Sequence, residues 1–313
     1  MRVVSLDEIK DVLPSVELMD EIEQGFIAYS KGESVVPPVG ELVIQKPPGD
    51  VHIKYGYLKG DDFYVIKIAS GFYENSLHGL PTSNGMMLIF SQKTGVPQAI
   101  LLDEGYLTDI RTAIAGAIAA KYLAPGNVTR IGIVGTGMQA RLQLEYLLPV
   151  TACRDVLVWG RDQSKLDRFV AEMEPLGLSL ASTTTAADIL RSCNLIVTTT
   201  PSHEPILSGP VMPGTHITAV GSDTPEKQEL GVDILAAADV VVADSISQCL
   251  LRGEIHKALN AGSVTASEIV ELGGIISGDA VGRVVDEQVT VADLTGVAVQ
   301  DVQIATAVFH ALR

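Results

Sequence analysis

A glycine-rich turn near the middle of the chain constrains its fold more than any other feature. An apolar run, Arg130–Val134, leads directly into G-T-G-M-Q-A at 135–140, and a helix with apolar periodicity follows. Gly135 permits a tight turn, Gly137 lets a pyrophosphate approach the backbone, and Ala140 is small enough for the helix to pack closely on the strand. The helix N-terminus offers N–H groups and a positive dipole end to phosphates. In this context the pattern predicts a dinucleotide site rather than a plain strand–turn–helix.

Further strands and helices follow at the spacing of a strand–helix alternation. The helical patterns are Ser164–Glu174 and Ala186–Ser192. The apolar strands are Val156–Trp159, Leu178–Ala181, Leu195–Thr199, His216–Val220 and Val240–Ala243. This order predicts an α/β fold with a parallel, doubly wound sheet of the Rossmann type. Ligand groups are then expected from the loops at the carboxyl ends of the strands.

The end of the second strand bears on the choice between NADP and NAD. An acidic residue at this place would bind the ribose 2′-hydroxyl and repel a 2′-phosphate. Here Gly160 stands at that place, and Arg161 beside it suits a 2′-phosphate. Asp162 suits the ribose if its side chain turns inward. NADP is therefore favoured, with NAD as the alternative.

The roughly 115 residues before the Rossmann unit have another character. A helix is expected at Pro14–Lys31, and a second one at Asp109–Leu123, opened by Thr108, leads into the Rossmann unit. The strand patterns between them are Val51–Leu58, Phe63–Ala69, Gly85–Ser91 and Gln98–Asp103. Because 91–95 reads as a hairpin turn, the sheet should be antiparallel.

Two cations in this part are expected at positions where a positive charge is energetically unfavourable. Lys67 lies inside an apolar strand, where a lysine is costly unless it is paired or used, although an edge-strand lysine could reach solvent. Arg111 is expected in the first turn of its helix, where the macrodipole disfavours a cation. Either Asp109 or a bound carboxylate or phosphate should compensate it.

Asp223 is the candidate general acid or base of the Rossmann half. It follows the strand His216–Val220 and precedes a helix that Thr224 and Pro225 would open. It is either an ordinary turn residue or a proton-transfer group in the crevice.

Length, charge and the spacing of single residues limit what kind of protein this chain can be. A chain of 313 residues fits two domains. Its net charge of −16 argues against nucleic acid and anionic membranes, which are bound through excess Lys and Arg. The N-terminus has no apolar core of signal-peptide length, so the cytoplasm is expected. The spacing of His and Cys suits no metal, and none is expected.

Taken together, these features resemble the ornithine cyclodeaminase/mu-crystallin family, which also includes archaeal-type alanine dehydrogenase and imino-acid reductases. The resemblance covers nearly the whole chain. It is carried by Val65–Lys67, Gly79–Thr82, Leu107–Ala113, Gly135–Ala140, Val220–Leu230 and Thr295–Asp301. It implies a homodimer with a Rossmann domain at 116–294. Residues 1–115 and 295–313 would form an α+β domain for substrate binding and dimerisation.

The resemblance also implies roles for single residues. Lys67 and Arg111 would bind or polarise the carboxylate and imine end of the substrate, and Asp223 would transfer a proton at the reacting nitrogen. Thr82 would contribute to the substrate site. The residues expected near the cofactor, besides Gly135, Gly137, Gly160 and Asp162, are Thr82, Ser83, Arg111, Thr112, Met138, Gln139, Arg161, Thr200, Val220 and Gly296.

The implied function is an NAD(P)H-dependent imine or imino-acid reductase, equivalently an amino-acid dehydrogenase, acting on a small α-amino or α-imino acid. One alternative is an ornithine cyclodeaminase, which releases ammonia and recycles NAD. The loop at Arg161 and the end of the chain at Arg313, without a C-terminal extension, weigh against it, whereas Asp223 favours it. The other alternative is a non-catalytic, NADP-dependent ligand-binding protein similar to mu-crystallin.

One departure from the family pattern concerns the residues that bind the carboxylate of the substrate. Many members carry an arginine on an early strand and a glutamate somewhat later. Counting back from Lys67 without gaps places the glutamate at Lys54 and the arginine near Val43, where Glu41 is the nearest charged residue. Either the loop at 47–49 contains an insertion that shifts the count, or the charges at these two positions are opposite to those of the family. In the second case Lys54 joins Lys67 and Arg111 in binding a small carboxylate or dicarboxylate, and ornithine and lysine should bind poorly.

Overall fold

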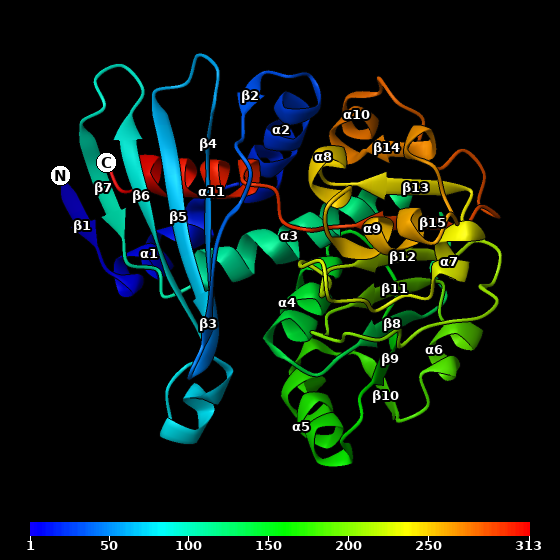
Figure 1. The fold of residues 1–313 in the computed structure, drawn as a ribbon. Helices are drawn as coiled ribbons and strands as arrows, with labels where there is room; N and C mark the ends of the chain where they lie inside the picture. Colours follow the sequence, from blue (N-terminus) through cyan, green and yellow to red (C-terminus); the bar gives the residue numbers. More distant parts are fainter. The chain divides into compact units, whose positions relative to one another are not determined.

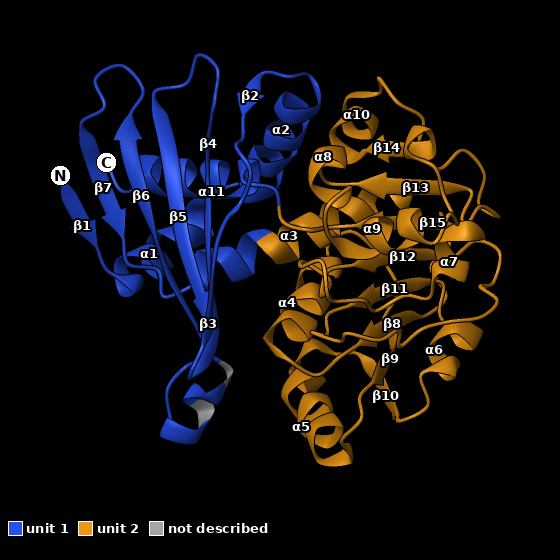
Figure 2. Cartoon of the chain, viewed as in Figure 1, with its two compact units in different colours: residues 1–111, 297–313 blue, residues 112–296 orange. Residues whose placement is uncertain are grey.

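The chain divides into two compact units (Figure 2). The computed structural model describes residues 1–313 apart from the side chains of Tyr73 and Ser76. Unit 1 comprises Met1–Arg111 and Val297–Arg313, and unit 2 comprises Thr112–Gly296. These boundaries lie four residues before and two residues after the expected divisions at 115 and 294.

Unit 2 is built on an eight-stranded sheet in the order β10-β9-β8-β11-β12-β15-β13-β14 (Figure 1). Its strands are β8 Ile131–Val134, β9 Asp155–Trp159, β10 Ser179–Thr183, β11 Leu195–Thr198, β12 His216–Ala219, β13 Val240–Ala243, β14 Ile269–Glu271 and β15 Thr290–Asp293. Every pairing in this sheet is parallel, which confirms the predicted Rossmann-type sheet. The sequence patterns did not identify β14 or β15, and β15 lies between β12 and β13.

Helices cover the sheet of unit 2. They are α4 Met138–Leu147, α5 Gln163–Met173, α6 Ala187–Ser192, α7 Val232–Ala236, α8 Ile246–Cys249, α9 Gly253–Asn260 and α10 Leu272–Ser277, with short 3-10 turns η3 Glu174–Leu176 and η4 Ala266–Glu268. Val134 and Ile196 of the sheet share one buried apolar cluster with Ile189 of α6 and Ile255 of α9. Gly132 is needed here, because a Cβ would lie 2.9 Å from the Ile189 side chain.

The helix expected after Asp223 is absent from the described structure. The segment from Thr224 has no helical turn before α7, which begins at Val232. Its main chain is bound elsewhere, because the carbonyl of Glu229 accepts hydrogen bonds from the N–H groups of Ile206 and Leu207. The prediction from Thr224 and Pro225 was wrong because these contacts with a distant loop replace the local helical pairing.

Unit 1 contains a seven-stranded sheet in the order β1-β7-β6-β5-β4-β2, with β3 paired to β4. Its strands are β1 Arg2–Val4, β2 Ser34–Val35, β3 Gly40–Gln45, β4 Pro48–Leu58, β5 Phe63–Gly71, β6 Ser83–Ser91 and β7 Pro97–Leu101. All pairings are antiparallel except that of β1 with β7, so the predicted antiparallel sheet is present.

Helices pack on one face of this sheet. The helical elements are α1 Leu6–Val12, η1 Leu13–Ser15, α2 Leu18–Ser30, η2 Tyr73–His78 and α11 Val299–Ala311. The C-terminal helix α11 contacts β4, β5 and α2 (Figure 1). The single helix expected at Pro14–Lys31 is wrong at its start, because η1 ends at Ser15 and α2 begins only at Leu18.

Helix α3, Tyr106–Leu123, begins earlier than expected. Glu104 and Gly105 have positive φ angles of 54° and 89°, which turn the chain just before the helix. The Asp103 carboxylate then accepts a hydrogen bond from the Leu107 N–H at 3.0 Å. The start at Thr108 was therefore wrong, and Arg111 lies beyond the first turn.

Candidate functional site

A crevice of about 1000 Å³ opens in unit 2, next to the residues that follow β8, β9 and β11. Six of the expected cofactor residues line it: Gly135, Gly137, Gly160, Arg161, Asp162 and Thr200. The other expected residues of unit 2, which are Thr112, Met138, Gln139, Val220 and Gly296, are not among its lining residues. Thr82, Ser83 and Arg111 belong to unit 1.

The glycine turn at the start of α4 fits a phosphate ligand. Gly135 has a φ of 124°, and a Cβ there would lie 2.6 Å from the Thr199 Oγ1. A Cβ on Gly137 would meet nothing within 4 Å, so open space lies in front of the backbone where a pyrophosphate would approach. Gly137 is also the N-cap of α4, which leaves the first N–H groups of that helix available.

The outer part of the crevice is rich in cations, although the chain as a whole is acidic. Arg161, Lys165 and Arg168 line the crevice and are exposed. Asp162 is the N-cap of α5, where its carboxylate accepts hydrogen bonds from the N–H groups of Ser164 and Lys165 at 2.9 and 3.3 Å. The sequence reasoning missed Lys165 and Arg168. Their i,i+3 spacing on one helix face just after Arg161 could have revealed them.

Unit 1 buries a cluster of charged residues that we call the cation cluster: Lys54, Lys67, Arg111 and Asp301. Lys54 and Lys67 are direct cross-strand partners on β4 and β5, so they share one face of the sheet. Their exposed fractions are 8% and 2%, and that of Arg111 is 5%. Lys67 Nζ lies 2.9 Å and Arg111 Nε 3.0 Å from the same oxygen of Asp301.

The charges in this cluster shift one another's protonation. Burial lowers the pKa of Lys67 to about 7, helped by the positive charges of Arg111 and Lys54 and opposed by Asp301. Burial alone would raise the pKa of Asp301, but the cations Arg111, Lys67 and Lys54 hold it below its usual value. Lys67 therefore changes charge near neutral pH.

Two residues of α11 complete the cluster, and the sequence reasoning gave neither a role. Asp301 compensates the charge of Arg111, a part that had been expected of Asp109 or a bound anion. Gln300 accepts a hydrogen bond from Arg111 NH1 at 3.1 Å. In the described part of the chain, the Gln300 Nε2 and one Asp301 oxygen are buried without a hydrogen-bond partner. The adjacent polar residues Gln300 and Asp301 at the start of a mostly apolar helix were the signal that could have identified them.

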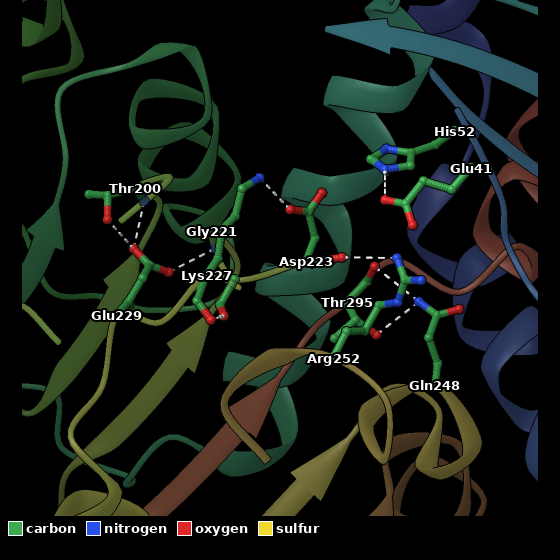
Figure 3. Close-up of polar contacts among 11 residues, drawn as sticks. Glu41, His52, Thr200, Gly221, Asp223, Lys227, Glu229, Gln248, Arg252 and Thr295 are labelled. Carbon is green, nitrogen blue, oxygen red and sulfur yellow. Dashed lines mark hydrogen bonds and ion pairs between the residues drawn. The ribbon is translucent and has the colours of Figure 1, made fainter. Parts of the chain in front are cut away.

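The other predicted residues are placed as follows. Asp223 follows β12, pairs with Lys227 at 2.6 Å, and accepts a hydrogen bond from Arg252 at its main-chain carbonyl (Figure 3). On β3, Glu41 contacts His52 at 2.9 Å. Val43, where the gap-free count places the family's arginine, is 74% exposed.

The described residues offer neither a membrane span nor a metal site. None of their helices is long and apolar enough to cross a membrane. None of their groups of His, Cys, Asp and Glu could hold a metal ion.

The parallel sheet, its glycine turn and the crevice beside it place the protein in the class of Rossmann-fold proteins. A family model described as ornithine cyclodeaminase/mu-crystallin matches residues 2–313. The chain belongs to this family, as the sequence motifs indicated.

Relatives in this family act on amino and imino acids, according to their names. The chain is 37% identical to an alanine dehydrogenase of Archaeoglobus fulgidus, over 98% of this chain and 94% of the relative. It is 31% identical to an iminosuccinate reductase of Paracoccus denitrificans, over 98% and 95% of the two chains.

Solved structures show the same fold. An archaeal alanine dehydrogenase dimer with bound NAD matches with a TM-score of 0.91 and 34% identity, covering 99% of this chain and 95% of that chain. The delta(1)-pyrroline-2-carboxylate reductase of Thermococcus litoralis, in complex with NADH and L-proline, matches with a TM-score of 0.93 and 26% identity over 99% and 97%. A lysine cyclodeaminase matches with a TM-score of 0.87 and 27% identity over 99% and 92%.

Proposed function

We propose that the protein is an NAD(P)H-dependent imino-acid reductase, equivalently an amino-acid dehydrogenase, acting on a small α-imino or α-amino acid. The cation cluster is the observation that carries this proposal. It buries three cations around Asp301. Burying cations is costly unless anions accompany them, so the cluster suits a substrate carboxylate.

The cluster offers the groups that such a substrate needs. Lys54, Lys67 and Arg111 can grip the carboxylate, with the unpartnered Gln300 amide as a further donor. Lys67, with its pKa near 7, can also polarise or protonate the imine end. Asp301 fixes the positions of Lys67 and Arg111 through its shared oxygen.

Unit 2 would hold the dinucleotide, which supplies or accepts the hydride. Its glycine turn would bind the pyrophosphate. Asp223, at the carboxyl end of β12, would manage the proton of the substrate nitrogen after Lys227 releases it. The roles of Thr82, Ser83, Thr112, Met138, Gln139, Val220 and Gly296 near the cofactor remain predictions from the family resemblance.

For the cofactor we propose a preference for NADP over NAD. Arg161, Lys165 and Arg168 face the crevice beside the place of the ribose 2′-group, and the Asp162 carboxylate is engaged in capping α5. Both features favour a 2′-phosphate. The solved relatives named above carry NAD or NADH, so direct comparison of the two cofactors decides the matter.

We also propose a homodimer formed through the sheet face of unit 1 that lies opposite α11. On the α11 side the row Lys54, Lys67, Met87 and Leu101 is buried. The neighbouring row, Tyr55, Ile66, Leu88 and Ile100, points the other way and is only partly covered. An apolar sheet face of this kind indicates an interaction surface. The variant Leu88→Glu should sediment as a monomer, and Val96→Lys, in an exposed turn, should not.

The cyclodeaminase alternative is tested by an assay with L-ornithine or L-lysine and a catalytic amount of oxidised cofactor. Release of ammonia and a cyclic amino acid without accumulation of reduced cofactor would support it. We expect neither product, because the cationic cluster disfavours a distal ammonium. Turnover of any imino acid would exclude the second alternative, a non-catalytic mu-crystallin-like binder. The cytoplasmic location stays a prediction.

A further inference from the structure

The buried carboxylate of Glu229 ties together the ends of two neighbouring strands of unit 2. One of its oxygens accepts hydrogen bonds from the Thr200 N–H at 2.6 Å and the Thr200 hydroxyl at 2.8 Å. The other accepts from the Thr198 hydroxyl at 2.7 Å and the Gly221 N–H at 2.8 Å. Thr198 is the last residue of β11, Thr200 follows that strand, and Gly221 follows β12. Figure 3 shows Glu229 between Thr200 and Gly221. The side chain thus bridges two loops with four donors.

The loops at Thr200 and Gly221 approach each other closely. A Cβ on Gly221 would lie 2.1 Å from the Thr200 carbonyl oxygen. We call Glu229 with its partners Thr198, Thr200 and Gly221 the clamp. A second carboxylate supports it, because Glu254 on α9 accepts hydrogen bonds from the N–H groups of Glu229 and Leu230 at 2.7 and 3.1 Å. Both glutamates are almost fully buried, and burial raises the pKa of Glu229 to about 7 and that of Glu254 to about 8.

Thr200 connects this clamp to the dinucleotide crevice, since it is one of the residues that line it. In a doubly wound sheet the dinucleotide crosses the switch point between the two halves. By this rule its adenosine half would lie on the side of β9 and β10, beside the glycine turn and Arg161, and its nicotinamide half on the side of β11 and β12. The clamp therefore acts on the loops of the nicotinamide half.

We propose that Glu229 is a positioning residue for the nicotinamide half of the cofactor, because it fixes the Thr200 and Gly221 loops in the geometry that binds it. The proposal rests on the proposed function, in that unit 2 is taken to bind a nicotinamide dinucleotide. Glu254 supports the clamp by orienting the main chain at Glu229.

Glu229→Gln provides a sharp test, because each carboxylate oxygen accepts a main-chain N–H. Whichever side the amide NH₂ takes, it faces the N–H of Thr200 or of Gly221, which cannot become an acceptor. The matched control is Glu226→Gln, which removes the same charge from an exposed position in the same loop. Thr198→Val is a milder second variant that deletes one donor and keeps the side-chain shape.

The readout is the Kd of NADH compared with that of ADP, a fragment that binds only the adenosine half. We expect Glu229→Gln to weaken NADH by about tenfold or more, since hydrogen bonds to a charged group are lost, while ADP stays within about twofold. Thr198→Val should weaken NADH by about threefold, with ADP unchanged. Equal weakening of NADH and ADP, or an NADH Kd equal to that of Glu226→Gln, would overturn the clamp. Failure of the wild-type protein to bind either NADH or NADPH would overturn the proposed function itself.

Discussion

The cation cluster of unit 1 and the buried glutamates of unit 2 hold charge in opposite ways. Unit 1 buries cations, Lys54, Lys67 and Arg111, around the carboxylate of Asp301. Unit 2 buries carboxylates such as Glu229 and Glu254, which are saturated by hydrogen bonds from the main chain and from threonine hydroxyls. The difference indicates which of the two clusters suits the binding of a charged ligand. Glu229 and Glu254 have found their partners within the fold, whereas the cation cluster groups three cations with the single carboxylate of Asp301, an excess of positive charge that suits an anionic substrate.

The largest effect is expected from Lys67→Ala. Loss of the buried lysine should lower kcat by about a hundredfold or more while the Kd of NADH stays unchanged, because the dinucleotide crevice belongs to unit 2. Steady-state kinetics and NADH fluorescence check this. A variant that keeps more than about a tenth of the wild-type kcat would make Lys67 a structural residue only.

Removal of Lys54 should affect substrate binding more than chemistry. Lys54→Ala is expected to raise KM for the preferred imino acid by about tenfold or more, the loss expected of a charge-assisted hydrogen bond, and to leave cofactor affinity alone. An unchanged KM, or a clear preference for ornithine over anionic and neutral amino acids, would show that the carboxylate is held elsewhere.

Asp301→Asn should shift the pH dependence of substrate binding. Asp301 raises the pKa of Lys67, which burial, Arg111 and Lys54 lower to about 7. Protonated Lys67 binds the carboxylate below this pKa, so in the wild type KM should rise as the pH increases through about 7. Without the negative charge of Asp301 the rise should begin about one pH unit lower.

The control for this shift is Asp62→Asn, which breaks an exposed ion pair with Lys93 in the same unit. It should leave the pH profile where the wild type has it. If Asp301→Asn gave the same profile as this control, Asp301 would not tune Lys67.

The smallest effect is expected at the edge of the dinucleotide crevice. Arg161→Ala should weaken NADPH by about fivefold and NADH by less than twofold, because an exposed ion pair to the 2′-phosphate is worth only about 1 kcal/mol. Arg191→Ala, which removes an exposed arginine paired with Asp188, is the matched control. Equal weakening of both cofactors would give no support to the proposed preference for NADP.

The sequence predicted the Rossmann unit well because its signals are local. The turn from β8 into α4 needs Gly135 and Gly137 within six residues of chain. All residues that determine its conformation are therefore close together in the sequence. Strand β15 was missed because its place between β12 and β13 depends on pairing with strands far along the chain. It also ends in Asp293, a buried polar residue that accepts a hydrogen bond from the Ile255 N–H.

Within the cation cluster, the pairing of Lys54 with Lys67 could be predicted because a hairpin sets its register. Lys54 and Lys67 flank the turn between β4 and β5 at equal distances, so a symmetric hairpin places them opposite each other. Asp301 lies 234 residues from Lys67, and no local pattern connects the two. The four-donor clamp of Glu229 was missed for the same reason, because its partners belong to two separate strand ends.

Reduction of small imino acids by the protein can be measured directly. The wild-type protein is mixed with NADPH or NADH and with iminosuccinate, delta(1)-pyrroline-2-carboxylate, or pyruvate and ammonia, and the absorbance of the reduced cofactor is followed. We expect oxidation of the cofactor with at least one of these substrates, a loss of that activity in Lys67→Ala, and a faster reaction with NADPH. No oxidation with any of them, together with ammonia release from ornithine, would contradict the proposed function.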